Sequence, residues 1–311
     1  MKLKTFSPED VAGKKVLVRV DFNVPLADGK VSDDTRINAH MPTLNALLDA
    51  GAKVALVSHL GRPKGTFNMK YTLQPVAEEL AKLTGWNVRF VPDCIGDAVK
   101  NAVDEWKDGE VLLLENARFY PEEEKNNKEF AEKLAANFDV FVMDAFSAAH
   151  RAHASTRAVS EILPSFAGHL IVREIEMLSA ARDNPQKPFV LILGGAKVSD
   201  KIAVVENMLK KVDKILVGGG MAFTFLKAEG KEIGTSLCEA DRLEYAKTML
   251  AQAKELGVEI LLPTDAVVAP EFKADTPATV VPTDAIPADQ MGLDVGPETA
   301  KAFADAIVAA K

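Results

Sequence analysis

The stretch VFVMDAFSAAHRAHAS, residues 140–155, joins a short apolar run to a cluster of cationic side chains. The run VFVMD is rich in β-branched and aromatic residues and predicts a buried strand. The segment after it brings His150, Arg151 and His153 within four positions, although the chain has only five histidines and a formal net charge of −8. In an acidic protein, such a cluster at the end of a buried strand indicates a local anion site.

Similar apolar runs recur along the chain and alternate with segments of helical periodicity. Near-continuous apolar strands crossed by helices are typical of parallel sheets that helices cover on both faces. We therefore expect an α/β protein with two doubly wound, Rossmann-like domains. The strands are predicted at 15–21, 53–59, 88–91, 111–115 and 140–144, and then at 189–195, 214–220, 258–263 and 278–282. The helices between them are predicted at 43–51, 75–85, 127–138, 200–211, 221–230 and 240–257.

The domain boundaries follow from the segment LIVREIEMLSAARDNPQKP, residues 170–188, which reads as one helix followed by a proline-bounded link. We place the first domain at 1–170, the junction at 171–188 and the second domain at 189–311. The charged stretch PEEEKNNKE, residues 121–129, is predicted to be a solvated loop leading into a helix.

Composition narrows the class of protein. A chain of 311 residues favours two domains over one. The acidic balance argues against broad binding of nucleic acid or anionic membranes. Cys94 and Cys238 resemble reduced thiols rather than a disulfide framework or a metal site. No apolar run approaches the ~18 residues of a membrane span, and the first residues lack the apolar core of a signal peptide. We expect a cytoplasmic protein.

Polar groups gather where the predicted strands of the first domain end. Ligands in such sheets bind beyond the carboxyl ends of the strands, and arginine binds phosphate or carboxylate in a bidentate manner. Each residue taken singly could be a surface residue, an ion-pair partner or a structural hydrogen bonder, but these explanations would all have to hold on one edge of one sheet. The pattern predicts a cleft for a small, multiply anionic ligand. Its residues are Asp21, Asn23 and Arg36 after the first strand, His59, Arg62 and Lys64 after the second, Arg118 after the fourth and Arg151 after the fifth.

The second domain has glycine turns at its strand ends. Gly194 and Gly195 follow one predicted strand, with Lys197 and Lys201 expected on the first turns of the next helix, and Gly218–Gly220 follow another strand. Such turns let backbone N–H groups approach phosphate, although many mark only close packing. Neither the Walker A pattern nor G-x-G-x-x-G is present, so a nicotinamide-dependent oxidoreductase is disfavoured.

Eight segments, in this order and spacing, resemble the phosphoglycerate kinase family. The resemblance implies a hinge-bending enzyme in which the first domain binds phosphoglycerate and the second binds nucleotide. It implies transfer of a phosphoryl group between 1,3-bisphosphoglycerate and ADP, giving 3-phosphoglycerate and ATP, with Mg²⁺. The segments are RVDFNVP (19–25), SHLGRPKG (58–65), LLENARF (113–119), DVFVMDAFSAAHRAHAS (139–155), LGGAKVSDKI (193–202), VGGGMAFTFL (217–226), LLPTDAVVA (261–269) and MGLDVGPET (291–299).

The resemblance also implies residue roles. Arg36 and Lys197 would clamp the transferring group, one from each domain, because phosphoryl transfer depends on positioning and electrostatics. His59 and His153 would position groups rather than carry protons. No protein metal site is expected, and a complete family member is expected to be monomeric. The phosphoglycerate-binding positions are Asp21, Asn23, Arg36, His59, Arg62, Arg118 and Arg151, and the nucleotide-binding positions are Gly195, Lys197, Lys201, Gly219 and Gly292.

Two features depart from the family pattern. Ser147 occupies a position where the family usually has glycine, so either the backbone is strained there or the turn tolerates a side chain. The family's later strand, its N-G-P segment and its G-G-G-D-[ST] turn do not follow within the 311 residues. We therefore expect a truncated second domain with an exposed sheet edge, and negligible phosphoryl transfer. The alternative is a non-catalytic fragment that binds phosphoglycerate or serves as a folding intermediate.

Overall fold

The computed structural model describes residues 3–311 and confirms the α/β class with parallel sheets. The chain divides into two compact units, unit 1 (Met1–Met177) and unit 2 (Leu178–Lys311). The division falls inside helix α9 (His169–Asp183), and therefore within the predicted junction 171–188. That this junction acts as a hinge stays a prediction.

Unit 1 is built on one six-stranded parallel sheet, in the order β5-β6-β4-β1-β7-β8. The sequence pattern did not predict β8, which is only three residues long. A two-stranded antiparallel hairpin, β2-β3, stands apart from the sheet. The strands are β1 (Lys15–Arg19), β2 (Leu26–Ala27), β3 (Lys30–Val31), β4 (Lys53–Val57), β5 (Asn87–Val91), β6 (Glu110–Leu114), β7 (Val140–Met143) and β8 (Ser165–Ala167).

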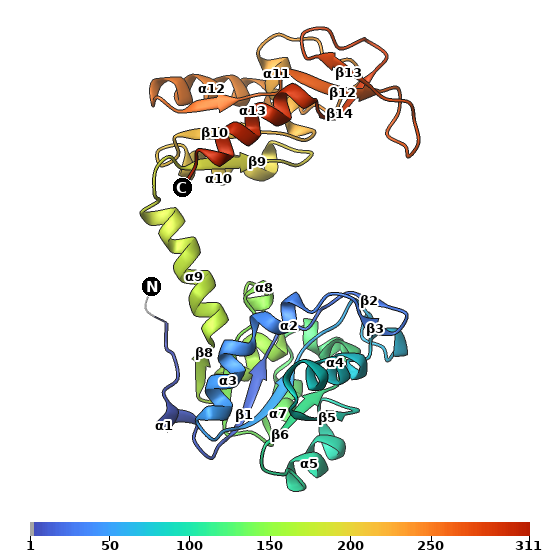
Figure 1. Cartoon of the computed structure of the whole chain (residues 1–311), viewed down its shortest axis with the longest axis vertical. Coiled ribbons are helices and arrows are strands. Elements are labelled where there is room, and N and C mark those ends of the chain that lie inside the picture. The colour runs from blue at the N-terminus through green and yellow to red at the C-terminus, as the bar shows by residue number, and fades with distance from the viewer. Residues whose placement is uncertain (1–2) are drawn as a thin grey trace. The chain divides into compact units, whose positions relative to one another are not determined.

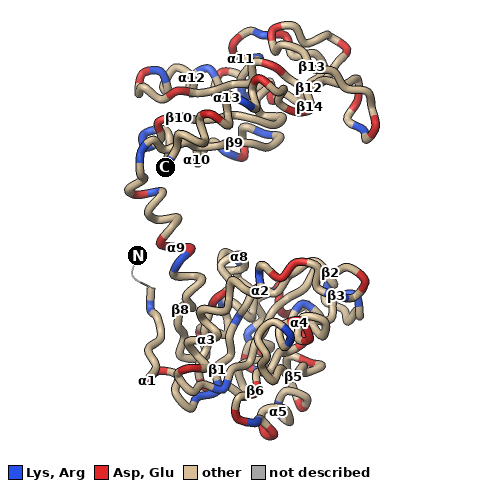
Figure 2. Tube along the Cα trace, in the orientation of Figure 1, with Lys and Arg blue, Asp and Glu red and all other residues tan. Residues whose placement is uncertain are grey.

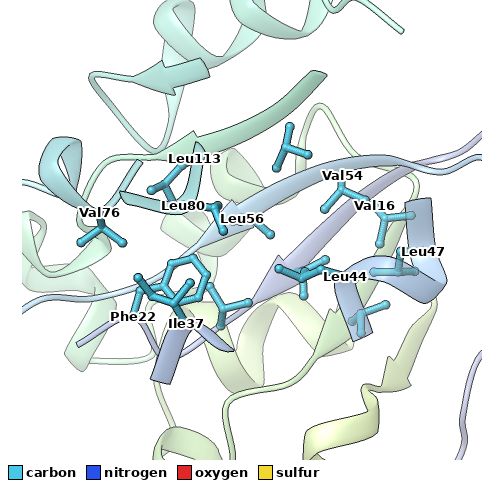
Figure 3. Close-up of a cluster of buried hydrophobic side chains, with 14 of the residues drawn as sticks. Val16, Phe22, Ile37, Leu44, Leu47, Val54, Leu56, Val76, Leu80 and Leu113 are labelled. Carbon is cyan, nitrogen blue, oxygen red and sulfur yellow. The ribbon is translucent and has the colours of Figure 1, made fainter. Parts of the chain in front are cut away.

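Helices cover both faces of this sheet (Figure 1). Successive strand residues point to opposite faces, so Val16 and Val18 of β1 join one core and Leu17 joins the other. The first core packs against α3 and α4, and Figure 3 shows Leu44, Leu47 and their neighbours filling it. The second core packs against α5 and α7. The helices are α1 (Pro8–Val11), α2 (Thr35–Ala39), α3 (Met41–Asp49), α4 (Gln74–Thr84), α5 (Gly96–Asp104), α6 (Pro121–Glu124), α7 (Lys128–Ala135) and α8 (Phe146–Ala149), with a π-helical turn at Ala154–Ala158.

Unit 2 contains two three-stranded sheets (Figure 1). The first is parallel, in the order β11-β10-β9. The expectation that 278–282 continues this parallel series is wrong, because β13 pairs antiparallel with β12 in the second sheet, whose order is β13-β12-β14. The strands are β9 (Val190–Leu193), β10 (Lys214–Val217), β11 (Glu259–Leu261), β12 (Asp265–Ala269), β13 (Thr279–Pro282) and β14 (Met291–Val295).

The parallel sheet of unit 2 is covered less completely than that of unit 1. One face packs against α10, α11 and α12. On the edge strand β9, Ile192 is 58% exposed, whereas residues 16–19 of the central strand β1 are buried. The helices are α10 (Ile202–Met208), α11 (Met221–Ala228), α12 (Leu243–Glu255) and α13 (Pro297–Val308).

Charged residues of both signs are interspersed along both units (Figure 2). Within residues 3–311, no helix has the length and apolar character needed to cross a membrane.

Candidate functional site

The candidate site of unit 1 is a cavity of about 250 Å³. All seven residues predicted to bind phosphoglycerate line it. They come from the loops after β1, β4, β6 and β7, which are four adjacent strands of the sheet, so the parallel topology brings their carboxyl ends together. β5 is the one strand predicted in this domain that no cavity residue follows, and it lies at the edge of the sheet. The lining residues are Asp21, Asn23, Arg36, His59, Gly61, Arg62, Arg118, Ser147, Ala148 and Arg151.

Asp21 organises one wall of the cavity. Its carboxylate accepts hydrogen bonds from Arg36 and from the Ser147 hydroxyl, and also from the Asn23 backbone N–H at 3.2 Å. Ser147 lies in the helical turn α8 and not in a left-handed conformation. The turn therefore tolerates its side chain, and the hydroxyl bonds to a cavity residue. Of the two alternatives left open by the sequence, the structure shows the one without backbone strain.

A second wall joins the loops after β1, β4 and β6. The side-chain oxygen of Asn23 accepts from the Gly61 N–H at 2.8 Å, and Arg118 Nη1 donates to the Gly61 carbonyl at 3.0 Å. Burial lowers the pKa of Arg118, the Glu124 carboxylate opposes this, and the nearby Arg151 adds to the lowering. Arg118 and Arg151 thus repel each other, and an anion in the cavity would relieve this repulsion.

A network of buried hydrogen bonds lies beneath the cavity, and the sequence pattern did not predict it. Arg19 is 1% exposed, and its Nε donates to the Ser155 hydroxyl at 2.9 Å. That hydroxyl donates to Glu123 at 2.5 Å, and the Ser155 N–H donates to the same carboxylate at 2.8 Å. Glu123 is 0% exposed, so the prediction of a solvated loop over 121–129 is wrong at this residue. The one sequence signal for this network was an arginine inside a predicted buried strand, because a buried charge needs a buried partner.

Both predicted positioning histidines have a lowered pKa. Burial lowers the pKa of His59 to about 2, with Arg19 as the next cause, and Arg19 Nη2 lies 3.1 Å from Nδ1 of the ring. Because a guanidinium only donates, Nδ1 accepts this hydrogen bond and the ring is neutral. Burial also lowers the pKa of His153, although Glu123, whose carboxylate lies 3.8 Å from its Nδ1, opposes the shift. The lowered pKa of His59 keeps its ring neutral near neutral pH, as a positioning role requires.

The glycine turns of unit 2 lie against each other. Gly219 has φ +65° and follows β10, and a Cβ placed on it would lie 3.0 Å from the backbone N of Gly195, which follows β9. Only glycine permits this approach in that conformation. The Met221 N–H donates to the Gly195 carbonyl at 2.8 Å. The two turns therefore form one surface of backbone at the carboxyl ends of adjacent parallel strands.

Of the two lysines predicted to bind nucleotide, Lys197 is placed differently from the prediction and Lys201 lies on a helical turn as predicted. Lys197 lies in the loop after β9, ahead of the 3₁₀ turn Ser199–Lys201, so its expected position on a helical turn is wrong. Lys201 ends that turn. The Glu239 carboxylate accepts from the Ser199 N–H at 3.0 Å and from the Ser199 hydroxyl at 2.6 Å. These bonds lower the pKa of Glu239, and they leave the Ser199 N–H already paired.

Gly292 lies on β14 in the antiparallel sheet, whereas the glycine turns follow strands of the parallel sheet. A Cβ at this position would lie 1.9 Å from the ring of Phe223 on α11. Close packing therefore explains the glycine on its own, and its predicted nucleotide contact stays a prediction. Within residues 3–311, no group of three or more His, Cys, Asp or Glu side chains is arranged to hold a metal ion.

Comparison with known proteins decides the family. A family model described as phosphoglycerate kinase matches residues 6–311. The chain belongs to the phosphoglycerate kinase family. The phosphoglycerate kinase of Clostridium botulinum is 54% identical over 311 residues, which is 99% of this chain and 78% of the relative. That of Moorella thermoacetica is 55% identical over 307 residues, with the same coverage of 99% and 78%.

The structural comparison gives the same family. The structure of phosphoglycerate kinase from Coxiella burnetii aligns with a TM-score of 0.80 at 41% identity, covering 99% of this chain and 78% of that one. The fold is therefore that of the phosphoglycerate kinases, with two Rossmann-like domains. The resemblance found in the sequence is confirmed.

Proposed function

We propose that unit 1 binds 3-phosphoglycerate or 1,3-bisphosphoglycerate in the 250 Å³ cavity, as one half of the family's phosphoryl transfer. The observation that carries the proposal is the convergence of arginines from four adjacent strand ends on one cavity. Arg36, Arg62, Arg118 and Arg151 would hold the phosphate and carboxylate groups, and Asp21, Asn23 and His59 would orient the ligand.

Unit 2 is proposed to bind ADP or ATP. The paired turns at Gly195 and Gly219 offer backbone close to one another, and Lys197 and Lys201 supply positive charge beside them. Gly292 completes the proposed set. Mg²⁺ would enter as the nucleotide complex, since it is usually bound through phosphate oxygens and keeps several waters. Arg36 and Lys197 are the proposed clamps on the transferring group. A cytoplasmic location and a monomeric complete enzyme belong to the same proposal.

Titration with 3-phosphoglycerate tests binding in unit 1. Arg151→Met should weaken binding by at least about tenfold, because it removes a charge-assisted hydrogen bond. Arg157→Met is a matched control, since Arg157 lies outside the cavity and pairs with Glu161 at 2.9 Å. It should leave the dissociation constant within about twofold. Equal losses in the two variants would contradict the proposed cavity.

Binding without transfer is the second candidate, and it is favoured by the fact that all seven phosphoglycerate residues lie in unit 1. A coupled assay with ATP, Mg²⁺ and 3-phosphoglycerate separates the two. Negligible turnover by these 311 residues stays our prediction. Turnover of about 1 s⁻¹ or above, the lower end for kinases, would contradict it.

A further inference from the structure

His40 is a buried histidine that the predicted site does not include. It is 1% exposed and caps the C-terminus of α2, directly before α3. Its Nε2 lies 2.9 Å from the backbone N of Asp21, and its Nδ1 lies 2.7 Å from Oδ2 of Asp144. A backbone N–H can only donate, so Nε2 accepts and the neutral ring carries its proton on Nδ1, which donates to Asp144.

The second oxygen of Asp144 holds the start of α9. Oδ1 accepts from the Leu170 N–H at 3.0 Å and from the Thr43 hydroxyl at 2.8 Å. The Thr43 oxygen in turn accepts from the His169 N–H at 2.8 Å. The first N–H groups of a helix have no partner within the helix, and a negative charge is favourable there. Asp144 is 0% exposed and thus acts as the anchor of this helix.

We propose that His40 is a positioning residue that links the phosphoglycerate cavity to the N-terminus of α9. Its ring bonds on one side to the backbone of Asp21, whose carboxylate lines the cavity, and on the other side to the Asp144 anchor. A ligand that orders Asp21 therefore also orders the first turn of α9, the helix in which the chain passes from unit 1 to unit 2. The inference rests on the proposed function, because it takes 3-phosphoglycerate as the ligand.

Two substitutions separate the two bonds of the ring. In His40→Asn the amide nitrogen takes roughly the place of Nδ1, so the bond to Asp144 is kept and the acceptor for Asp21 is lost. In His40→Gln the amide oxygen takes roughly the place of Nε2, so the acceptor for Asp21 is kept and the donor to Asp144 is lost. His40→Ala removes both. Trp106→Phe is the control, because it removes a buried hydrogen bond, from Nε1 to the Glu110 carbonyl at 2.9 Å, at the opposite end of the strands.

The experiment measures the 3-phosphoglycerate dissociation constant by calorimetry and amide hydrogen exchange over 168–176, with and without ligand. We expect the ligand to slow this exchange in the wild type. His40→Asn should keep the exchange of the free protein, lose the ligand-induced slowing and bind about fivefold more weakly, as expected for one lost hydrogen bond. His40→Gln should bind within about twofold of the wild type but exchange faster over 168–176. Trp106→Phe should change neither measurement.

The outcomes are distinguishable. If His40→Ala, His40→Asn and His40→Gln bind ligand and exchange as the wild type does, the inference is overturned while the proposed function stands. If the wild type binds no 3-phosphoglycerate, the proposed function fails, and the ligand-linked part of the inference fails with it. Thermal unfolding of each variant shows whether it folds. If His40→Ala does not fold, the other two variants, which each keep one bond, decide the matter.

Discussion

The two units place their candidate sites at the carboxyl ends of parallel strands but differ in what lies beneath those sites. In unit 1 the sheet has six strands with a core on each face, and the cavity residues rest on buried, paired charges such as Arg19 and Glu123. In unit 2 the parallel sheet has three strands, Ile192 on its edge is 58% exposed, and the glycine turns after β9 and β10 pack backbone against backbone.

This difference predicts which unit is the more stable and which unit binds its ligand unaided. Buried apolar area stabilises in proportion to its extent, and buried charges contribute only when each has its partner. Unit 1 meets both conditions within its own residues. We therefore expect unit 1 to be the more stable unit and to bind its ligand without help from unit 2. The following changes test that contrast.

The largest effect is expected from Glu123→Gln. It leaves Arg19 buried without the carboxylate that Ser155 links to it, so the free energy of unfolding of unit 1 should fall by about 3 kcal/mol. Glu239→Gln is the counterpart in unit 2. Glu239 is only partly buried, so its loss should cost about 1 kcal/mol. Urea unfolding of each variant measures the loss in free energy of unfolding. Equal losses in the two variants would contradict the difference between the units.

A pH effect of intermediate size is expected from His59. Its pKa is about 2 in the folded chain, against roughly 6.5 when unfolded. The unfolded chain therefore takes up the proton first, and the stabilisation present above pH 6.5 is lost as the pH falls. Between pH 7.5 and 5.5 this amounts to about 1.4 kcal/mol. In His59→Asn, which keeps an acceptor for Arg19, the decline in stability should be smaller by that amount. Parallel pH profiles for the two chains would contradict the assignment.

The smallest effect is expected from Ser147→Ala. It removes one donor to Asp21, which still accepts from Arg36 and the Asn23 N–H. Binding of 3-phosphoglycerate should weaken by no more than about fivefold. Ser160→Ala, which removes a hydroxyl bonded to the Arg157 carbonyl outside the cavity, should have no effect on binding. A loss of more than about tenfold in Ser147→Ala would mean that Ser147 contacts the ligand itself.

Much of unit 1 could be predicted because its signals are local. Apolar strands and the polar residues directly after them are visible in sequence, and the parallel topology then forces the strand ends together. Glu123 and His40 could not be found this way. Their roles come from partners 32 and 104 positions away, Ser155 and Asp144, which only the fold brings into contact.

Unit 2 was harder to predict for a physical reason. The run 278–282 is apolar, and periodicity does not distinguish a parallel strand from an antiparallel one. The position of Lys197 depended on where the helix begins, and helix boundaries are weakly encoded when no strong cap stands at the start. The glycines of the turns were recognised, but Gly292 was assigned by motif, and its contact with Phe223 depends on tertiary packing.

The most direct test of the contrast is urea unfolding of the wild-type chain followed by two probes. Both tryptophans, Trp86 and Trp106, lie in unit 1, so tryptophan fluorescence reports that unit alone, whereas far-ultraviolet circular dichroism reports both units. We predict two steps in the circular dichroism, the first at lower urea and without a change in fluorescence. A single transition that coincides in both probes would contradict the claim that unit 1 is the more stable, self-supporting unit.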